Sequence, residues 1–234
     1  MSEQTPRPAG TATSSLAARP GAHGHPGRLL VLEGIDGSGR STHIALLEEH
    51  LRHHGIGAIR TSLATGSIAG EPIRALKREE HPDPVRASLL YAADLAERSE
   101  RIVTPALRAG LVVLADRWAY TPIARAEARG ANPGWLEEIF SFLPSPDVTI
   151  FLDVDPETVL ERRRSEQLRP FEVGSDLGLS EDLEESYRLF QGRLYASFRR
   201  QAERYEFTSI ASSGNVATVD AAIRASIDPL VRSR

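Results

Sequence analysis

The chain has 234 residues, of which 41% are hydrophobic, enough for one α/β domain with its own core and too few for two. It contains no cysteine, which excludes a disulfide scaffold, a Cys-ligated zinc site and a thiol nucleophile. The formal net charge of −4 argues against binding to nucleic acid, because no strong positive field attracts a polyanion.

The first 27 residues are rich in Pro, Gly, Ala, Ser and Thr and have no apolar core of the kind a signal peptide needs. Such a composition buries too little surface to offset the entropy of ordering. We therefore expect residues 1–27 to be a disordered tail and residues 28–234 to form the domain. No apolar run approaches the roughly 20 residues that cross a bilayer, so we expect no membrane partner and a cytoplasmic location.

Strand-like and helical patterns alternate along the chain. Short apolar runs predict buried strands at 29–33, 57–62, 111–116, 148–154 and 207–211. Helical patterns lie between them, at 41–54, 70–80, 121–129, 133–142 and 181–205, with a terminal helix after the last strand. Asp83-Pro84 and Asp155-Pro156 predict two further helix starts, because Asp caps a first turn and Pro fits its first position. The alternation predicts a doubly wound parallel α/β sheet.

A glycine-rich turn separates the first strand from the first helix. Residues 34–42 read Gly-Ile-Asp-Gly-Ser-Gly-Arg-Ser-Thr and fit the P-loop pattern except at Arg40, where lysine is expected. Glycines let backbone N–H groups turn toward phosphate oxygens, and the helix dipole adds to the attraction. A glycine-rich turn without a ligand is the structural alternative. The residues expected to bind ATP are Gly34, Ile35, Asp36, Gly37, Ser38, Gly39, Arg40, Ser41 and Thr42.

Two positions of this loop bear on catalysis. The Ser41 hydroxyl is expected to hold Mg²⁺. The lysine ammonium is a compact charge at the end of a flexible side chain, whereas the arginine guanidinium is a wider, planar group. Since both carry the charge that developing phosphate needs, Arg40 is a candidate catalytic residue. A slowed kinase and a nucleotide binder without turnover both stay open.

Three motifs in a fixed order carry a family resemblance: the loop GIDGSGRST, the triplet Asp116-Arg117-Trp118, and LDVDPE at 152–157 followed by clustered arginines. From about Arg28 onward the chain resembles the thymidylate kinase family. The resemblance implies a P-loop NTPase fold with a short lid, here at about 162–182. It also implies ATP- and Mg²⁺-dependent transfer of a phosphoryl group to dTMP.

The resemblance assigns roles to several side chains. Asp36 matches a carboxylate that approaches the acceptor sugar, Arg117 an arginine that grips the acceptor phosphate, and Asp116 a carboxylate that supports Mg²⁺. The chemistry agrees, since a guanidinium suits phosphate and strand ends of α/β sheets face the ligand crevice. A surface ion pair is the structural alternative for Asp116 and Arg117.

The base and the transferring phosphoryl group have candidate partners as well. Arg74 matches an arginine that reads the pyrimidine edge. Tyr91 replaces a phenylalanine that stacks on the base, although a core aromatic fits its apolar surroundings too. Arginines of the lid are expected to stabilise the transferring group, unless they form a solvated basic face. These are Arg162, Arg163, Arg164 and Arg169, of which Arg162, Arg164 and Arg169 are the catalytic candidates.

The departures from the family gather on the acceptor side. Residues 62–67 read Ser-Leu-Ala-Thr-Gly-Ser where the family has Arg-Glu-Pro-Gly-Gly-Thr. Arg125-Ala126 replaces a Tyr-Gln pair, which makes Arg125 a candidate acceptor contact. Three hypotheses follow: a dTMP kinase, a kinase of another nucleotide or small phosphate metabolite, and a nucleotide-binding protein without turnover. The resemblance further suggests small-molecule nucleotide substrates and a homodimer.

Overall fold

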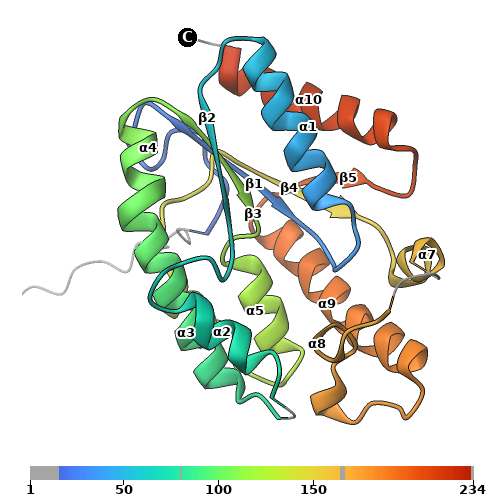
Figure 1. Ribbon diagram of the computed structural model, residues 1–234. Coiled ribbons are helices and arrows are strands. Elements are labelled where there is room, and N and C mark those ends of the chain that lie inside the picture. The colour runs from blue at the N-terminus through green and yellow to red at the C-terminus, as the bar shows by residue number, and fades with distance from the viewer. Residues whose placement is uncertain (1–15, 80, 164–166, 233–234) are drawn as a thin grey trace, which may run out of the picture.

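Five parallel strands form a central sheet in the computed structural model, which describes residues 16–79, 81–163 and 167–232. The strand order is β2-β3-β1-β4-β5, so β1 lies in the middle; the chain runs from β1 to the edge strand β2, returns to β3, and then crosses to β4 and β5 on the other side (Figure 1). This confirms the predicted doubly wound parallel sheet. The strands are β1 (Arg28–Glu33), β2 (Ala58–Ser62), β3 (Val112–Asp116), β4 (Val148–Asp153) and β5 (Thr208–Ala211).

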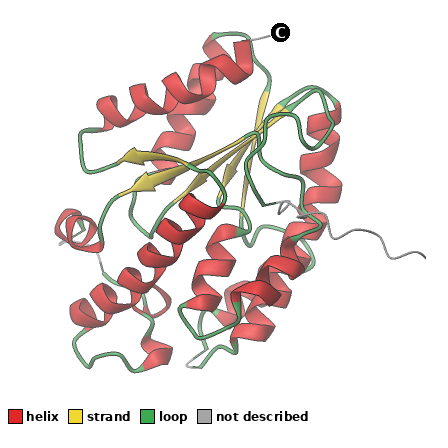
Figure 2. Ribbon diagram, turned by 180° about the vertical axis from the view of Figure 1, so that it is seen from behind, coloured by secondary structure: helices red, strands yellow, loops and turns green. Residues whose placement is uncertain are grey.

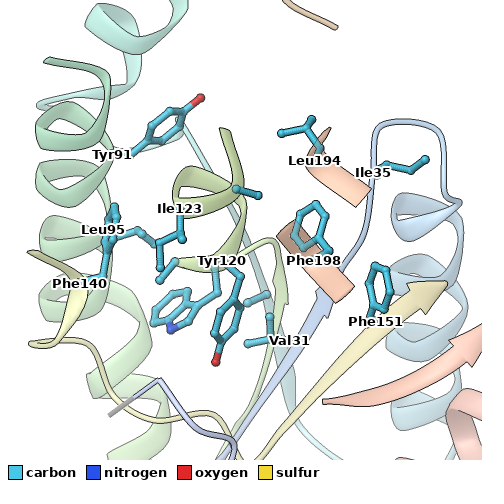
Figure 3. Packing of buried hydrophobic residues seen from close by; sticks show 14 of the residues in the cluster. Val31, Ile35, Tyr91, Leu95, Tyr120, Ile123, Phe140, Phe151, Leu194 and Phe198 are labelled. Carbon is cyan, nitrogen blue, oxygen red and sulfur yellow. The ribbon is translucent and has the colours of Figure 1, made fainter. Parts of the chain in front are cut away.

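Helices cover both faces of the sheet, as a sheet built from apolar runs requires (Figures 1 and 2). Successive residues of β1 point to opposite faces. Leu29 and Val31 join a larger core with three helices, α3 (Pro84–Arg98), α5 (Tyr120–Glu127) and α9 (Leu183–Arg204). Leu30 and Leu32 join a second core with α1 (Arg40–His53) and α10 (Val216–Arg232). In Figure 3, Val31 and Phe151 of the sheet lie near Tyr120, Leu194 and Phe198 in the larger core.

Each predicted helical segment agrees with a helix of the structure to within a few residues, and two short helices lie outside these segments. They are α1 (Arg40–His53), α2 (Gly70–Leu76), α3 (Pro84–Arg98), α4 (Thr104–Arg108), α5 (Tyr120–Glu127), α6 (Pro133–Phe140), α7 (Pro156–Arg162), α8 (Pro170–Val173), α9 (Leu183–Arg204) and α10 (Val216–Arg232). A π-helical turn, Ser99–Val103, joins α3 to α4, and a 3₁₀ turn, Ser175–Leu177, follows α8. Both predicted caps form: Asp83 accepts from the N–H of Arg86, and Asp155 from that of Thr158. The five-residue α4 and the four-residue α8 lie where no helix was predicted, because their patterns are too short to detect.

Residues 16–27, hereafter the N-terminal strap, pack against the domain although their composition predicts a disordered tail. The Leu16 side chain is buried in the larger core, and its carbonyl accepts a 2.5 Å hydrogen bond from the Tyr120 hydroxyl. The buried Asp147 carboxylate accepts from the N–H of Gly21, from that of Leu29 and from the His23 ring. The buried Leu16 side chain and the hydrogen bonds to Tyr120 and Asp147 thus hold in place a segment whose composition predicts disorder. Residues 1–15 lie outside the described part of the chain.

The winding of the chain determines where a site can form. In the parallel register between β1 and β3, Leu32 pairs with Asp116, so these two strands end at the same level. The loop after β1 therefore lies beside the residues that follow β3. This is the reversal point of strand order, where α/β sheets have their ligand crevice.

Candidate active site

The loop between β1 and α1 turns tightly on its glycines. Gly37 has φ 86° and Gly39, which caps α1, has φ 94°, a region that side chains rarely adopt. A Cβ atom at Gly37 would come within 2.5 Å of Val159 and 2.9 Å of the Arg163 side chain. The glycines thus permit both the turn and the close approach of α7.

Arg40 turns back into this loop and binds its carbonyl groups. Its Nη1 donates to the carbonyl oxygens of Gly34 and Ile35, each at 2.6 Å, and its Nε donates to Asp116 Oδ1 at 3.1 Å. The residue is 8% exposed. In this arrangement the guanidinium fastens the beginning of the loop to the end of β3.

Ser41 and Asp116 lie together at the start of α1. The Ser41 hydroxyl donates to Asp116 Oδ2 at 3.1 Å, which joins the two residues predicted to hold Mg²⁺. A hydroxyl and a carboxylate are hard oxygen donors of the kind this cation takes. In the described ranges, no group of three or more His, Cys, Asp or Glu side chains could hold a metal ion by itself.

Asp36 is the centre of an ionic network on the other side of the loop. Its carboxylate accepts from Arg117 Nη2 at 2.5 Å and from Arg125 Nη2 at 3.1 Å. Burial favours a higher pKa for Asp36, but the two guanidinium groups outweigh it and hold the pKa well below its usual value. Burial, with repulsion from Arg40, lowers the pKa of Arg117 to about 10. All these groups therefore stay charged at neutral pH.

A buried carboxylate holds the turn that presents Arg117. Arg117 has φ 76°, an uncommon value for a non-glycine residue. Glu33 accepts from the Trp118 N–H at 2.7 Å and from the Thr121 hydroxyl at 2.6 Å, and that hydroxyl accepts from Arg117 Nη1 at 2.7 Å. Burial raises the pKa of Glu33. The sequence analysis missed Glu33, although a charged residue ending an apolar strand was a signal.

A cavity of about 710 Å³ lies against this network, within the range of ligand pockets. Its lining combines the phosphate loop, the ends of β2 and β3, the residues that follow α2, and side chains of α5 and α8. The lining residues are Asp36, Arg40, Ser41, Ser62, Leu63, Lys77, Arg78, Asp116, Arg117, Arg125, Arg169, Pro170, Phe171 and Glu172. Sequence reasoning missed Lys77, Arg78 and Phe171, because nothing local marks which face of a short helix meets a distant loop.

The predicted lid arginines separate in the structure. Arg169 lines the large cavity, whereas Arg162 donates to the backbone carbonyls of Ser212 at 2.9 Å and Ser213 at 2.6 Å. Arg163 packs beside Gly37 and pairs with Glu172 at 3.1 Å. Arg162 and Arg163 line a second recess above Gly39, Arg40, Ser41 and Thr42. Arg164 lies outside the described residues.

Neither Arg74 nor Tyr91 lies on the wall of the large cavity. Arg74 donates to the carbonyl of Ala64 at 2.9 Å and pairs with Glu71, with half of its side chain exposed. Tyr91 is 2% exposed and belongs to the larger core, where Figure 3 shows it above Leu95 on the same helix. Its hydroxyl accepts from Arg125 Nη1 at 3.2 Å, so it supports Arg125 from behind.

The altered loop after β2 has its own anchors. Asp94 accepts from the N–H groups of Ala64 at 2.9 Å and Gly66 at 2.8 Å, and Glu97 accepts from that of Ile68 at 2.9 Å. A Cβ atom at Gly66 would lie 2.7 Å from Glu97 Oε2. Two carboxylates of α3 thus fix the loop without its family arginine and glutamate.

A parallel sheet with a phosphate loop after β1 and an acid–arginine pair after β3 defines a P-loop nucleotide-binding protein. The thymidylate kinase family model matches residues 32–223. The chain is 31% identical over 191 residues to probable thymidylate kinase 2 of Saccharolobus solfataricus, covering 81% of this chain and 89% of that protein. It is 36% identical over 185 residues to thymidylate kinase of Ruegeria pomeroyi, covering 76% and 83%.

A third relative, probable thymidylate kinase of Pyrococcus horikoshii, is 41% identical over 142 residues, covering 58% of this chain and 69% of the relative. The chain belongs to the thymidylate kinase family, as its three motifs predict. Within the described ranges, no helix is both long and apolar enough to span a bilayer.

Proposed function

We propose that this protein is a kinase that transfers the γ-phosphoryl group of ATP to dTMP, giving ADP and dTDP. One observation carries the proposal: the phosphate loop, Asp116 and Arg117 meet at one cavity in a chain of the thymidylate kinase family. An oxygen of the acceptor phosphate forms the new bond to phosphorus as the bond to ADP breaks. The protein's part in such a transfer is positioning and neutralisation of charge.

The donor phosphates fit the glycine-rich loop at the N-terminus of α1. Arg40 already uses its Nη1 on the carbonyls of Gly34 and Ile35. We propose that it supports the loop by keeping these oxygens away from the phosphates, while its remaining charge faces the cavity. Ser41 and Asp116 would hold Mg²⁺, which takes its other ligands from phosphates and water and neutralises phosphate charge when bound.

The acceptor phosphate fits Arg117, whose orientation is fixed by Thr121 and Asp36. Because Asp36 binds both Arg117 and Arg125, its carboxylate keeps two guanidinium groups from repelling each other. On the transferring group, Arg163 and Arg169 are the proposed lid contacts. Arg162 instead ties α7 to the loop after β5.

The direct test is ADP release by the purified protein with Mg·ATP and dTMP, beside other nucleoside monophosphates and an Arg40→Lys variant. Turnover that prefers dTMP supports the proposal and shows that arginine serves in the loop. ATP binding without acceptor-dependent ADP release, in both proteins, overturns it.

A homodimer and a cytoplasmic location stay predictions of the family resemblance and the composition. So does the expectation that nucleic acid is not a partner. Sedimentation of the purified protein measures the first, and a mass of one chain contradicts it.

A further inference from the structure

Phe171 of α8 is an aromatic side chain on the wall of the large cavity. The sequence analysis did not assign it to the base. The apolar lining consists of Leu63, Pro170 and Phe171, and Tyr91 is not part of it. We propose that the acceptor base stacks on Phe171. This inference rests on the proposed function and names a specificity residue for that same site.

The direction of the acceptor in the cavity supports this assignment. Phosphoryl transfer requires the acceptor phosphate beside the phosphate loop, at the end lined by Arg40, Asp116 and Arg117. Arg125 lies between Asp36 and Phe171: its Nη2 donates to Asp36 at 3.1 Å, and its guanidinium carbon lies 4.8 Å from the Phe171 ring centre. A nucleotide whose phosphate binds Arg117 would therefore have Phe171 within reach of its base, one guanidinium group beyond Asp36.

The Phe171 ring is held by three cations. Besides Arg125, the guanidinium of Arg129 lies 5.2 Å and the Lys77 amine 5.6 Å from the ring centre. Each lies within the range of a cation–π contact. Such contacts restrict the ring to one orientation, and a fixed ring is a better stacking surface because little entropy is lost on binding.

The backbone under Phe171 is equally well fixed. The Gln191 amide donates to the Glu172 carbonyl at 2.7 Å, and the Ser186 hydroxyl donates to that of Val173 at 2.8 Å. Three residues after Val173, Asp176 pairs with Arg129 through two 2.8 Å contacts. The short helix is thus tied to α9, and the 3₁₀ turn that follows it is tied to Arg129 just beyond α5, so the segment that carries Phe171 is fixed on both sides.

The proposal explains how Tyr91 can lie in the core of a family member. A base needs one aromatic face beside its hydrogen-bonding partners, since base–aromatic stacking contributes strongly to binding. In this chain α8 supplies that face on the cavity wall. Tyr91 supports Arg125, which in turn contacts the ring of Phe171.

The test measures dTMP binding to the intact protein and to Phe171→Ala, with Phe171→Leu as a second variant that keeps apolar volume. We expect dTMP to bind about 10-fold more weakly to Phe171→Ala, and at an intermediate level to Phe171→Leu. Binding of 2-deoxyribose 5-phosphate, measured as competition with dTMP, should not change. Phe142→Ala is the matched control, because Phe142 is 51% exposed and does not line the cavity.

Each other outcome has a defined meaning. Equal loss of dTMP and of 2-deoxyribose 5-phosphate overturns the inference, because Phe171 then supports the phosphate site. Unchanged binding also overturns it, and tighter binding does so by showing that the ring blocks the base. If the unaltered protein hydrolyses ATP equally well without dTMP, the proposed function itself is rejected, whatever the Phe171 variants show. If the unaltered protein releases ADP only with dTMP, and the Phe171 variants bind dTMP as well as it does, the proposed function stands and only the role of Phe171 is rejected.

Discussion

Two buried carboxylates, one at each end of the sheet, use similar partners for different purposes. Asp36 lies at the carboxyl ends of the strands and binds two guanidinium groups beside a 710 Å³ cavity. Asp147 lies at the amino ends, where His23, Arg28 and two backbone N–H groups surround it and its side chain is 0% exposed. A paired charge beside a cavity can exchange partners with a ligand, whereas a paired charge in a closed contact only holds segments together.

This difference predicts that changes at the cavity end affect turnover more than folding. Replacing Arg117 by alanine should lower kcat/KM for dTMP by about 10³-fold, because it removes a charged donor from the acceptor phosphate. Steady-state kinetics measure the effect, and Arg117→Lys should recover part of it by restoring the charge. Near-normal activity of Arg117→Ala would show that Arg117 does not bind the acceptor phosphate.

The second prediction concerns the Ser41–Asp116 pair. Asp116→Asn should raise the Mg²⁺ concentration for half-maximal activity by about 10- to 100-fold, because a charged oxygen donor is lost. A Mg²⁺ titration at saturating ATP and dTMP measures it, with Asp153→Asn as a control at the end of β4. An unchanged Mg²⁺ requirement would exclude Asp116 from metal binding.

The third prediction applies to the opposite end. Asp147→Ala leaves the N–H groups of Gly21 and Leu29 without their acceptor and should lower the free energy of unfolding by about 3 kcal/mol. Urea denaturation measures the loss, while kcat per folded molecule should be unchanged. A large fall in kcat with unaltered stability would show that the two ends are not separate in function.

Acid provides a fourth test of the cavity end. Since the folded-state pKa of Asp36 lies below its ordinary 3.8, its ionisation stabilises the fold above that value. That contribution is lost as pH falls from about 4 toward the folded pKa, by at most about 1.4 kcal/mol per pH unit. Asp36→Asn should therefore show a shallower loss of stability below pH 4, and identical slopes would contradict the ion-pair account.

The smallest effect is expected where the N-terminal strap meets α5. Tyr120→Phe removes the hydroxyl that binds the Leu16 carbonyl and should lower stability by about 1 kcal/mol. Chemical denaturation can resolve this change, and Tyr195→Phe offers a comparison at a partly exposed hydroxyl. Equal stability of Tyr120→Phe and the parent would show that this hydrogen bond does not hold the strap.

Patterns within the sequence determined the strands, most helix starts and the phosphate loop. These features depend on neighbours a few residues apart: glycines where φ is positive, Asp-Pro at helix starts, and apolar runs in buried strands. The order of the motifs also placed Asp116 and Arg117 beside the loop, because parallel strands end at one edge.

Only the tertiary structure decided which way the long side chains point. The sequence contains Arg40, Arg162 and Tyr91, but their partners come from elsewhere in the fold: the Asp116 carboxylate, the Ser212 carbonyl and the Arg125 guanidinium, respectively. In the same way, Leu16 is ordered by a core that includes Tyr120, which lies 104 positions further along the chain and binds the Leu16 carbonyl. Contacts between distant segments carry no local signal, so the motifs locate the site, while packing assigns each side chain its partner.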